Sequence, residues 1–206
     1  MLNKAVKVIE RGGVVIYPTE TLYAMGCAIR SESAVERVAQ FKNRDETKPF
    51  PVIIGSREQL SQVAAVEEGD ATRLMEAFWP GPLSILVPAQ KDLPSRLTNS
   101  EGLISLRWTP HPDAQVLCRM SGTPLLATSA NTSGRPAVSC SESLEQELTR
   151  QADWVLKRPC SDQFRLPSTV VRPLDRDRVL MVREGAIPAN RLWEAGIKVE
   201  PDTMRN

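Results

Sequence analysis

Residues 12–26 read Gly-Gly-Val-Val-Ile-Tyr-Pro-Thr-Glu-Thr-Leu-Tyr-Ala-Met-Gly, and we expect the rest of the chain to be built around them. The apolar, β-branched run at 14–17 predicts a strand that is buried on both faces. Pro18 ends this strand because proline has no backbone N–H for the ladder. Residues 19–21 then place two hydroxyls and a carboxylate beyond the carboxyl end of the strand, where open α/β sheets bind ligands. The alternative interpretation is a turn held by local side-chain hydrogen bonds.

The composition is that of an ordinary globular protein. The chain has 206 residues, of which 41% are hydrophobic and 25% charged, and this length fits one domain whose core needs no disulfide or metal. The 26 Lys and Arg against 25 Asp and Glu exclude a basic field over the whole molecule, so any nucleic-acid binding is local. The sequence shows neither a signal peptide nor an apolar run near 18 residues, and we therefore expect a cytoplasmic protein without a membrane span.

Strands and helices alternate along the chain. Helices are predicted at 2–9, from a capping box of Ser33 with Glu36 to 42, after Ser56 with Gln59, at 70–79, 112–122 and 142–151, and after Pro188. Strands are predicted at 14–17, 52–54, 83–87, 103–107, 124–128, 168–171 and 179–183. This order predicts a single-domain α/β fold over residues 1–200 with helices packed on a sheet, followed by a frayed polar tail at 201–206.

Three polar clusters remain once the apolar positions are assigned to the core. They are Lys42, Arg44 and Lys48; residues 129–134; and Arg107, Ser168, Thr169 and Arg183. Ammonium and guanidinium groups suit phosphate oxygens, and small residues at 129–134 let a ligand approach the backbone closely. Each cluster also has a structural alternative, since cations are favoured at the carboxyl end of a helix, 129–134 can be a tight turn, and arginines at strand ends are commonly surface residues.

Several familiar catalytic motifs are missing. The sequence has no G-x-x-x-x-G-K-[ST] and no G-x-G-x-x-G, which excludes the P-loop and Rossmann routes to nucleotide binding. The cysteines at 27, 118, 140 and 160 have no C-x-x-C spacing, which argues against a zinc site, and we interpret them as small core residues. His111, the single histidine, is interpreted as structural. Any chemistry would then depend on positioning and on charge stabilisation.

Taken in order, the motifs resemble those of the YrdC/TsaC-like threonylcarbamoyl-adenylate synthases over residues 12–187. They are Gly12-Gly13, Pro18-Thr19-Glu20-Thr21, Lys42-x-Arg44, Lys48-Pro49, Trp79-Pro80-Gly81-Pro82, Arg107, Ser129-x-Asn131, Ser168-Thr169-Val170 and Arg183-x-Gly185. The resemblance implies a twisted mixed sheet around a concave, positively charged cavity. It also implies a nucleotidyltransferase that converts L-threonine, bicarbonate and ATP into threonylcarbamoyl-adenylate and pyrophosphate. A separate transferase then uses that product to modify an adenosine of tRNA.

The resemblance implies roles for nine side chains. Lys42, Arg44, Ser129 and Asn131 match catalytic positions; these four with Lys48 and Arg183 match ATP contacts; and Thr21, Arg107 and Ser168 match positions that grip threonine. Mg²⁺ is expected because it bridges the phosphates of ATP, and no protein cage for a metal is visible in the sequence.

The chain departs from the family pattern at a few positions. Asn43 and Asp45 replace the glycine and proline of K-G-R-P, and Glu184 replaces the proline of R-P-G. Many relatives have a threonine-contacting histidine where Ile53 and Ile54 stand. These departures leave a second hypothesis, the YciO branch, which acts on the adenylate or binds RNA without making the adenylate. The retained K-x-R and S-x-N motifs favour the synthase, and the missing histidine favours the alternative.

Two further hypotheses are weaker. Carbamoyl-phosphate-using relatives are a third class, but they belong to much longer chains. Direct tRNA or double-stranded RNA binding has modest support from the arginines at 172, 176, 178 and 183, because aspartates alternate with them and favour a solvated face. If RNA binds there, its affinity should fall steeply with salt.

Overall fold

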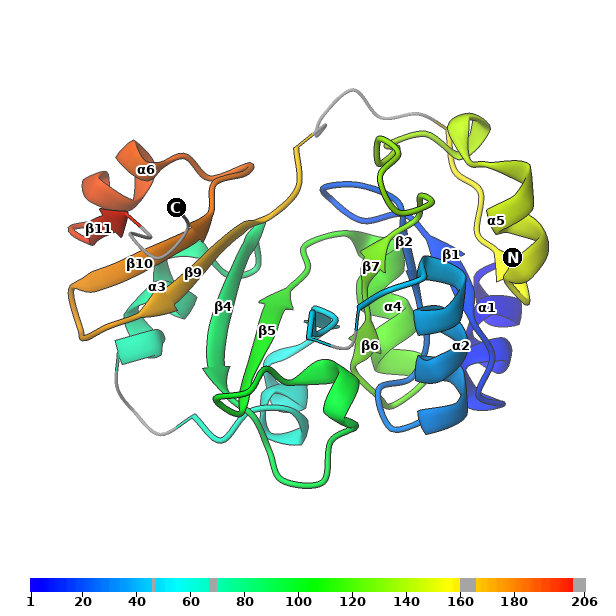
Figure 1. The fold of residues 1–206 in the computed structure, drawn as a ribbon, viewed down its shortest axis with the longest axis horizontal. Helices are drawn as coiled ribbons and strands as arrows, with labels where there is room; N and C mark the ends of the chain where they lie inside the picture. The colour runs from blue at the N-terminus through cyan, green and yellow to red at the C-terminus, as the bar shows by residue number, and fades with distance from the viewer. Residues whose placement is uncertain (46, 67–69, 160–165, 202–206) are drawn as a thin grey trace.

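The computed structural model describes residues 1–45, 47–66, 70–159 and 166–201, which form two mixed sheets flanked by helices (Figure 1). The smaller sheet has the order β7-β2-β1-β8, from β1 (Val15–Tyr17), β2 (Ala24–Gly26), β7 (Thr128–Ser129) and β8 (Trp154–Val155). The larger sheet has the order β11-β10-β9-β4-β5-β3-β6, from β3 (Val52–Ile54), β4 (Leu83–Pro88), β5 (Leu103–Trp108), β6 (Leu125–Leu126), β9 (Thr169–Pro173), β10 (Arg178–Arg183) and β11 (Lys198–Pro201). The predicted α/β class is therefore confirmed, with two sheets in place of one.

The helices lie on the outside of these sheets. The α-helices are α1 (Leu2–Glu10), α2 (Glu32–Lys42), α3 (Asp70–Phe78), α4 (Pro112–Met120), α5 (Gln146–Gln151) and α6 (Ala189–Glu194), and the 3₁₀ turns are η1 (Arg57–Gln62), η2 (Ser95–Leu97) and η3 (Ser141–Ser143). Figure 1 shows α1, α2 and α5 beside the smaller sheet, and α3 and α6 beside the end of the larger sheet that carries β9–β11. Within the smaller sheet, the central strands β1 and β2 are buried throughout, whereas the edge strands β7 and β8 are partly exposed.

Strand β1 confirms the prediction of a strand buried on both faces. Val15, Ile16 and Tyr17 are all fully buried. Because alternate side chains of a strand point to opposite faces, Ile16 packs in one core cluster while Val15 and Tyr17 pack in the other. The strand lies between β2, which is antiparallel to it, and β8, which is parallel.

The segment predicted as one strand at 124–128 is two short strands in different sheets. β6 pairs with β3 in the larger sheet, and β7 pairs with β2 in the smaller one. Between them, the amide of Ala127 donates to the carbonyl of Pro51, 2.9 Å away. Gly26 lies directly against this crossing, since a Cβ added there would stand 1.6 Å from the carbonyl oxygen of Leu126. The crossing joins the two sheets, and it brings Ser129 to their junction.

Other boundaries differ from the prediction because local signals compete. Helix α2 begins at Glu32 with Ser31 at the N-cap, so the predicted capping box of Ser33 with Glu36 is wrong. Gln59 does not cap a helix; its side chain accepts from the amide of Gly55 at 2.9 Å and donates to the carbonyl of Cys118 at 2.7 Å.

Helix α5 is shorter than predicted, and three strands were not predicted at all. α5 begins at Gln146, after the separate turn η3, whereas the prediction placed its start at residue 142. Strands β2, β8 and β11 were missed because two to four residues are too few for alternation to show. β11 extends to Pro201, and the rest of the predicted tail, 202–206, lies outside the described residues.

Two of the three described cysteines, Cys27 and Cys118, are buried core residues. Cys27 and Cys118 are free and fully buried, and burial raises the pKa of the Cys27 thiol to about 12. Cys140 is instead disulfide-bonded, which corrects its interpretation as a core residue, and Cys160 lies outside the described residues. Within the described ranges, no helix combines the length and apolar character needed to cross a membrane.

Candidate active site

A cavity of about 350 Å³ opens where the two sheets meet, and we call it the main cavity. Its walls come from β2 and β7 of the smaller sheet, from β3, β4, β5 and β10 of the larger sheet, and from the loop between β1 and β2. Six of the nine predicted site residues line it, namely Thr21, Arg44, Arg107, Ser129, Ser168 and Arg183. These six side chains, which are distant in sequence, therefore converge on one hollow.

The loop that carries Thr21 is fixed by its own hydroxyls. Thr19 Oγ1 accepts from the amides of Thr21 and Leu22, both at 3.2 Å, and donates to the carbonyl of Leu22 at 2.6 Å. The turn interpretation of this loop is thus also correct. The turn places Thr21 on the wall of the main cavity, so the local turn serves the site and does not exclude it.

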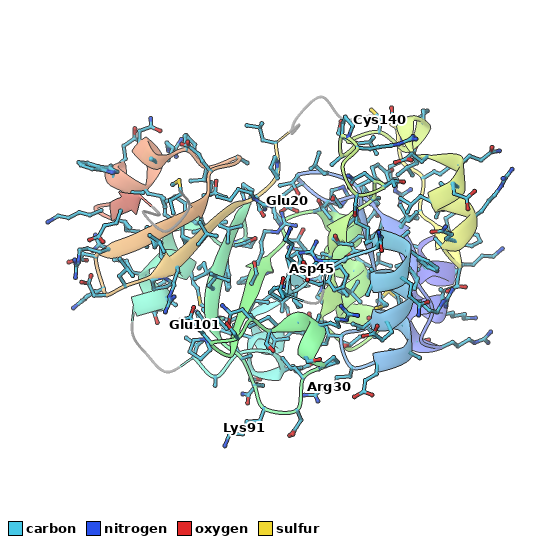
Figure 2. All side chains as sticks on the ribbon, viewed as in Figure 1. Glu20, Arg30, Asp45, Lys91, Glu101 and Cys140 are labelled. Atoms are coloured by element: carbon cyan, nitrogen blue, oxygen red, sulfur yellow. The ribbon has the colours of Figure 1, made fainter. Side chains whose placement is uncertain are left out.

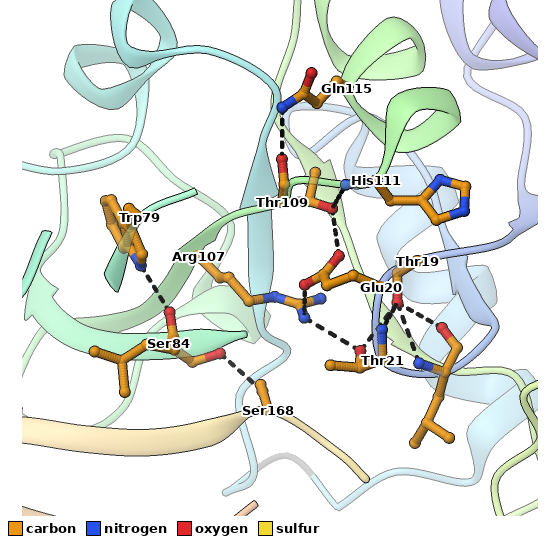
Figure 3. Close-up of polar contacts among 12 residues, drawn as sticks. Thr19, Glu20, Thr21, Trp79, Ser84, Arg107, Thr109, His111, Gln115 and Ser168 are labelled. Atoms are coloured by element: carbon orange, nitrogen blue, oxygen red, sulfur yellow. Dashed lines mark hydrogen bonds and ion pairs between the residues drawn. The ribbon is translucent and has the colours of Figure 1, made fainter. Parts of the chain in front are cut away.

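Arg107 lies at the centre of a buried polar network (Figure 3). The residue is 6% exposed, and its Nη1 forms an ion pair with Glu20 and a 3.1 Å hydrogen bond to Thr21 Oγ1. The other oxygen of Glu20 accepts from Thr109 Oγ1 at 2.5 Å. Figure 2 shows Glu20 in the middle of the molecule, whereas Glu101 and Lys91 lie at its edge. A buried ion pair needs such additional hydrogen bonds to offset its desolvation.

Ser168 and Arg183 form a second polar group on the opposite wall. Arg183 Nη2 donates to the Ser168 carbonyl at 2.8 Å and to Ser168 Oγ at 3.1 Å. Ser84 Oγ donates to Ser168 Oγ at 2.9 Å. Ser84, which is 2% exposed, is not among the predicted site residues, although a serine inside the apolar run at 83–87 can be noticed in the sequence.

Lys42 and Asn131 are brought together, but behind the wall of the main cavity. They are 4% and 8% exposed and do not line the main cavity, although the resemblance implies catalytic positions and ATP contacts for both. The Lys42 ammonium donates to the carbonyl of Ser129 at 2.9 Å, to the carbonyl of Asn131, and to Asn131 Oδ1 at 3.1 Å. Burial first, and then the charge of Arg44, lowers the pKa of Lys42 to about 8. The ammonium thus holds the segment 129–131 against the end of α2.

Arg44 and Lys48 have different positions. Arg44 lines the main cavity, where its Nε and Nη2 donate to the carbonyls of Lys48 and Pro49, each at 2.7 Å, and its guanidinium lies 4.7 Å from the ring centre of Phe50. Lys48 is exposed and does not line the cavity. Asn43 has φ 43°, so it takes the left-handed conformation that a glycine would adopt more readily at the end of a helix.

The lining of the main cavity favours anions. Of its described residues, three are arginines and none is Asp or Glu. In the described part of the chain, no group of three or more His, Cys, Asp or Glu side chains could hold a metal ion. A phosphate or a carboxylate fits this donor set, because guanidinium groups bind both in a bidentate way.

A second cavity of about 350 Å³ lies on the other side of the loop that contains Thr21. Glu20, His111 and Arg158 line it. His111 Nδ1 accepts from the amide of Asp113 at 3.2 Å and so caps α4, while burial lowers its pKa. The interpretation of His111 as structural therefore agrees with its cap.

Comparisons with known proteins agree with one another. The family profile described as "Telomere recombination" (Sua5_yciO_yrdC) matches residues 7–185. A threonylcarbamoyl-AMP synthase of Nitrosococcus oceani is 34% identical over 152 residues, which are 74% of this chain and 82% of that protein. A protein of the same name from Pseudomonas fluorescens is 34% identical over 179 residues, covering 84% of this chain and 96% of that protein.

Solved structures give the same result for the fold. Sua5 of P. abyssi, complexed with L-threonine, superimposes with a TM-score of 0.85 and 27% identity, covering 97% of this chain and 58% of that chain. YciO of E. coli superimposes with a TM-score of 0.80 and 28% identity, covering 93% of this chain and 92% of that chain. This chain therefore spans less than two thirds of the Sua5 chain but most of the length of the synthases and of YciO. With the family profile matched over residues 7–185 and the polar motifs gathered on one cavity, the chain belongs to the Sua5/YciO/YrdC family.

Proposed function

We propose that this protein is an L-threonylcarbamoyladenylate synthase, which forms threonylcarbamoyl-AMP and pyrophosphate from L-threonine, bicarbonate and ATP. One observation carries the proposal: buried Arg107, beside Thr21, shares a single cavity with Arg44 and Arg183. A site for a small carboxylate thereby adjoins cations suited to phosphates. The curated relatives with the synthase name support the same conclusion.

The chemistry follows from the substrates and the lining of the cavity. The α-carboxylate of threonine binds Arg107. The amine of threonine loses a proton, and its nitrogen then attacks the carbon of bicarbonate, so that water is lost and a carbamate forms. A carbamate oxygen bonds to the α-phosphorus of ATP, and the bond to pyrophosphate breaks. Negative charge grows on the leaving oxygens, where Arg44 and Arg183 stabilise it.

Three predicted site residues act less directly in this proposal. Lys42 and Asn131 hold the backbone that presents Ser129 to the nucleotide, and exposed Lys48 contacts ATP only at the rim. Mg²⁺ bound to the phosphates of ATP would neutralise part of their charge, and it would need few protein ligands because it keeps its own waters.

The product and its destination are also part of the proposal. A separate cytoplasmic transferase takes the threonylcarbamoyl group to tRNA, and any RNA binding by this chain is weak. A second candidate function, a YciO-like protein that acts on a preformed adenylate, is favoured by Ile53, because it lines the cavity where the resemblance implies a threonine-contacting histidine.

Pyrophosphate release from ATP tests the proposal. We expect release only when L-threonine and bicarbonate are both present. Arg44→Ala should lose about a hundredfold or more, as is usual when a charge-stabilising group is removed. Lys42→Ala and Asn131→Ala should also lose activity, because they release the backbone that presents Ser129. Glu36→Gln, which changes an exposed carboxylate paired with Arg96 at 2.9 Å, is the control and should retain full activity. ATP turnover that ignores threonine, or unchanged turnover in all three variants, would contradict the synthase assignment.

A further inference from the structure

The guanidinium of Arg107 is only partly occupied by the protein. Both of its hydrogen-bonded contacts use Nη1, one to Glu20 and one to Thr21 Oγ1 at 3.1 Å. No described residue accepts a hydrogen bond from Nε or Nη2 of Arg107, and neither nitrogen is sealed from solvent. Since Arg107 lines the main cavity, the edge formed by Nε and Nη2 is the one left for a ligand.

Glu20 is itself firmly anchored (Figure 3). Its second oxygen accepts from Thr109 Oγ1 at 2.5 Å, and Thr109 is fully buried. Thr109 is held in turn by the amide of His111, which donates to Oγ1 at 3.2 Å, and by Gln115 Nε2, which donates to its carbonyl at 2.9 Å. Glu20 is 8% exposed, so it has little freedom to leave this position.

The two members of the ion pair face different cavities. Arg107 lines the main cavity but not the second, and Glu20 lines the second but not the main one. Glu20 therefore holds the arginine from behind and does not occupy the space in front of it. A carboxylate in the main cavity would meet the free edge of the guanidinium without displacing Glu20.

We propose that Glu20 is a positioning residue, which holds Nη1 of Arg107 so that the Nε–Nη2 edge receives the α-carboxylate of the amino-acid substrate in two parallel hydrogen bonds. The inference rests on the proposed function, because that function supplies the amino acid. Two parallel bonds to a planar fork bind a carboxylate with directional selectivity. A guanidinium that is already held in place loses less conformational entropy when the ligand arrives.

The test compares a ligand that has the carboxylate with one that lacks it. Calorimetry measures the Kd of L-threonine and of L-threoninol for the wild type, Glu20→Gln and Thr109→Val. Glu20→Gln keeps the shape but removes the charge, and Thr109→Val keeps the ion pair but releases one oxygen of Glu20. In both variants we expect the Kd of L-threonine to rise about tenfold or more, the usual effect of losing a hydrogen bond to a charged group.

In both variants the Kd of L-threoninol should stay within about twofold of the wild-type value. The ratio of the Kd of L-threoninol to that of L-threonine should therefore fall about tenfold. The Kd of ATP should not change, whereas a general loss of structure would weaken both substrates. Glu36→Gln is the matched control, since it also converts a glutamate paired with an arginine into an amide. If Glu20→Gln does not fold, as judged by its circular dichroism, Thr109→Val decides.

The outcomes separate this inference from the function on which it rests. If the wild type binds L-threonine and both variants bind it equally well or more tightly, Glu20 does not position Arg107, and the synthase proposal stands. If the wild type itself does not bind L-threonine, the proposed function is overturned and this inference with it.

Discussion

Lys42 shows how one buried charge can determine the shape of a binding segment. Its ammonium contacts the carbonyls of Ser129 and Asn131 and the side chain of Asn131, which lie 87 and 89 positions further along the chain. All of these partners are acceptors, so they need the protonated amine. In the sequence, Lys42-x-Arg44 indicates a phosphate-binding motif. In the structure, Lys42 instead links α2 to the segment 129–131.

The lowered pKa of Lys42 predicts a pH dependence. Burial brings the pKa from its ordinary value of 10.5 to about 8, so the folded chain loses this proton before the unfolded chain does. The folded state is therefore penalised below pH 8, and the penalty is relieved between about pH 8 and 10.5. We expect ATP affinity to fall as the pH rises through 8, because the neutral amine has fewer hydrogens for the three acceptors.

The measurement is the Kd of ATP between pH 7 and 9.5, in the wild type and in Lys42→Met. The variant should bind ATP weakly at every pH and show no step near 8. In the wild type, Lys42 should make the free energy of unfolding rise above pH 8. In Lys42→Met this rise should be absent. A wild-type ATP affinity that is independent of pH over this range would contradict the role given to Lys42.

At the scale of elements, the crossing between β6 and β7 determines the site, and Gly26 in β2 makes the crossing possible. A Cβ at this position would lie 1.6 Å from the carbonyl oxygen of Leu126 and 3.2 Å from the hydroxyl of Tyr17. The same carbonyl oxygen of Leu126 also accepts a hydrogen bond from the hydroxyl of Tyr17, 3.0 Å away. Because the obstacle is backbone, it cannot move aside as a flexible side chain would.

We expect Gly26→Ala to lower the free energy of unfolding by about 3 kcal/mol, at the upper end of the cost of overpacking. It should also weaken ATP binding, because the strand that follows the crossing carries Ser129. Urea denaturation measures the first effect and calorimetry the second. Gly134→Ala is a suitable control: a Cβ there meets nothing within 4 Å, so only its φ of 85° is strained. Equal stability of the two variants would refute the argument from close approach.

At the scale of the whole molecule, charge is balanced and locally paired. The chain has a formal net charge of +1. Arg172 pairs with Glu101 at 2.6 Å, and Arg178 pairs with Asp175 at 2.6 Å and with Glu200 at 2.9 Å. Two of the four arginines considered for RNA binding, Arg172 and Arg178, therefore face carboxylates that compete with phosphates.

From this balance we expect only weak binding to tRNA, with a Kd above about 1 μM at physiological salt, as for non-specific contacts. Fluorescence anisotropy with labelled tRNA at about 50 and 200 mM salt would measure it, and affinity should fall steeply over that range. Nanomolar binding that resists salt would show an RNA site of another kind.

Strand β1, most helices, the α/β class and the residue types of the site could be predicted from local patterns in the sequence. The reason is that burial of one face of a strand or helix imposes a period that can be recognised locally. The sequence also identified Glu20 and Thr21 as polar groups at the end of a buried strand. The sequence did not predict the short strands β2 and β8, because their extended conformation depends on pairing with neighbouring strands in the sheet.

The contacts between side chains that are distant in sequence could not be predicted and follow from the arrangement of the two sheets. Arg107 and Glu20 are 87 positions apart, and their pairing follows from the placement of β5 next to the loop after β1. The same holds for Lys42, whose burial depends on the crossing between the two sheets. Hydrogen bonds and ion pairs of this kind act over a few ångströms in space, whereas sequence periodicity reports only on neighbours along one strand or helix.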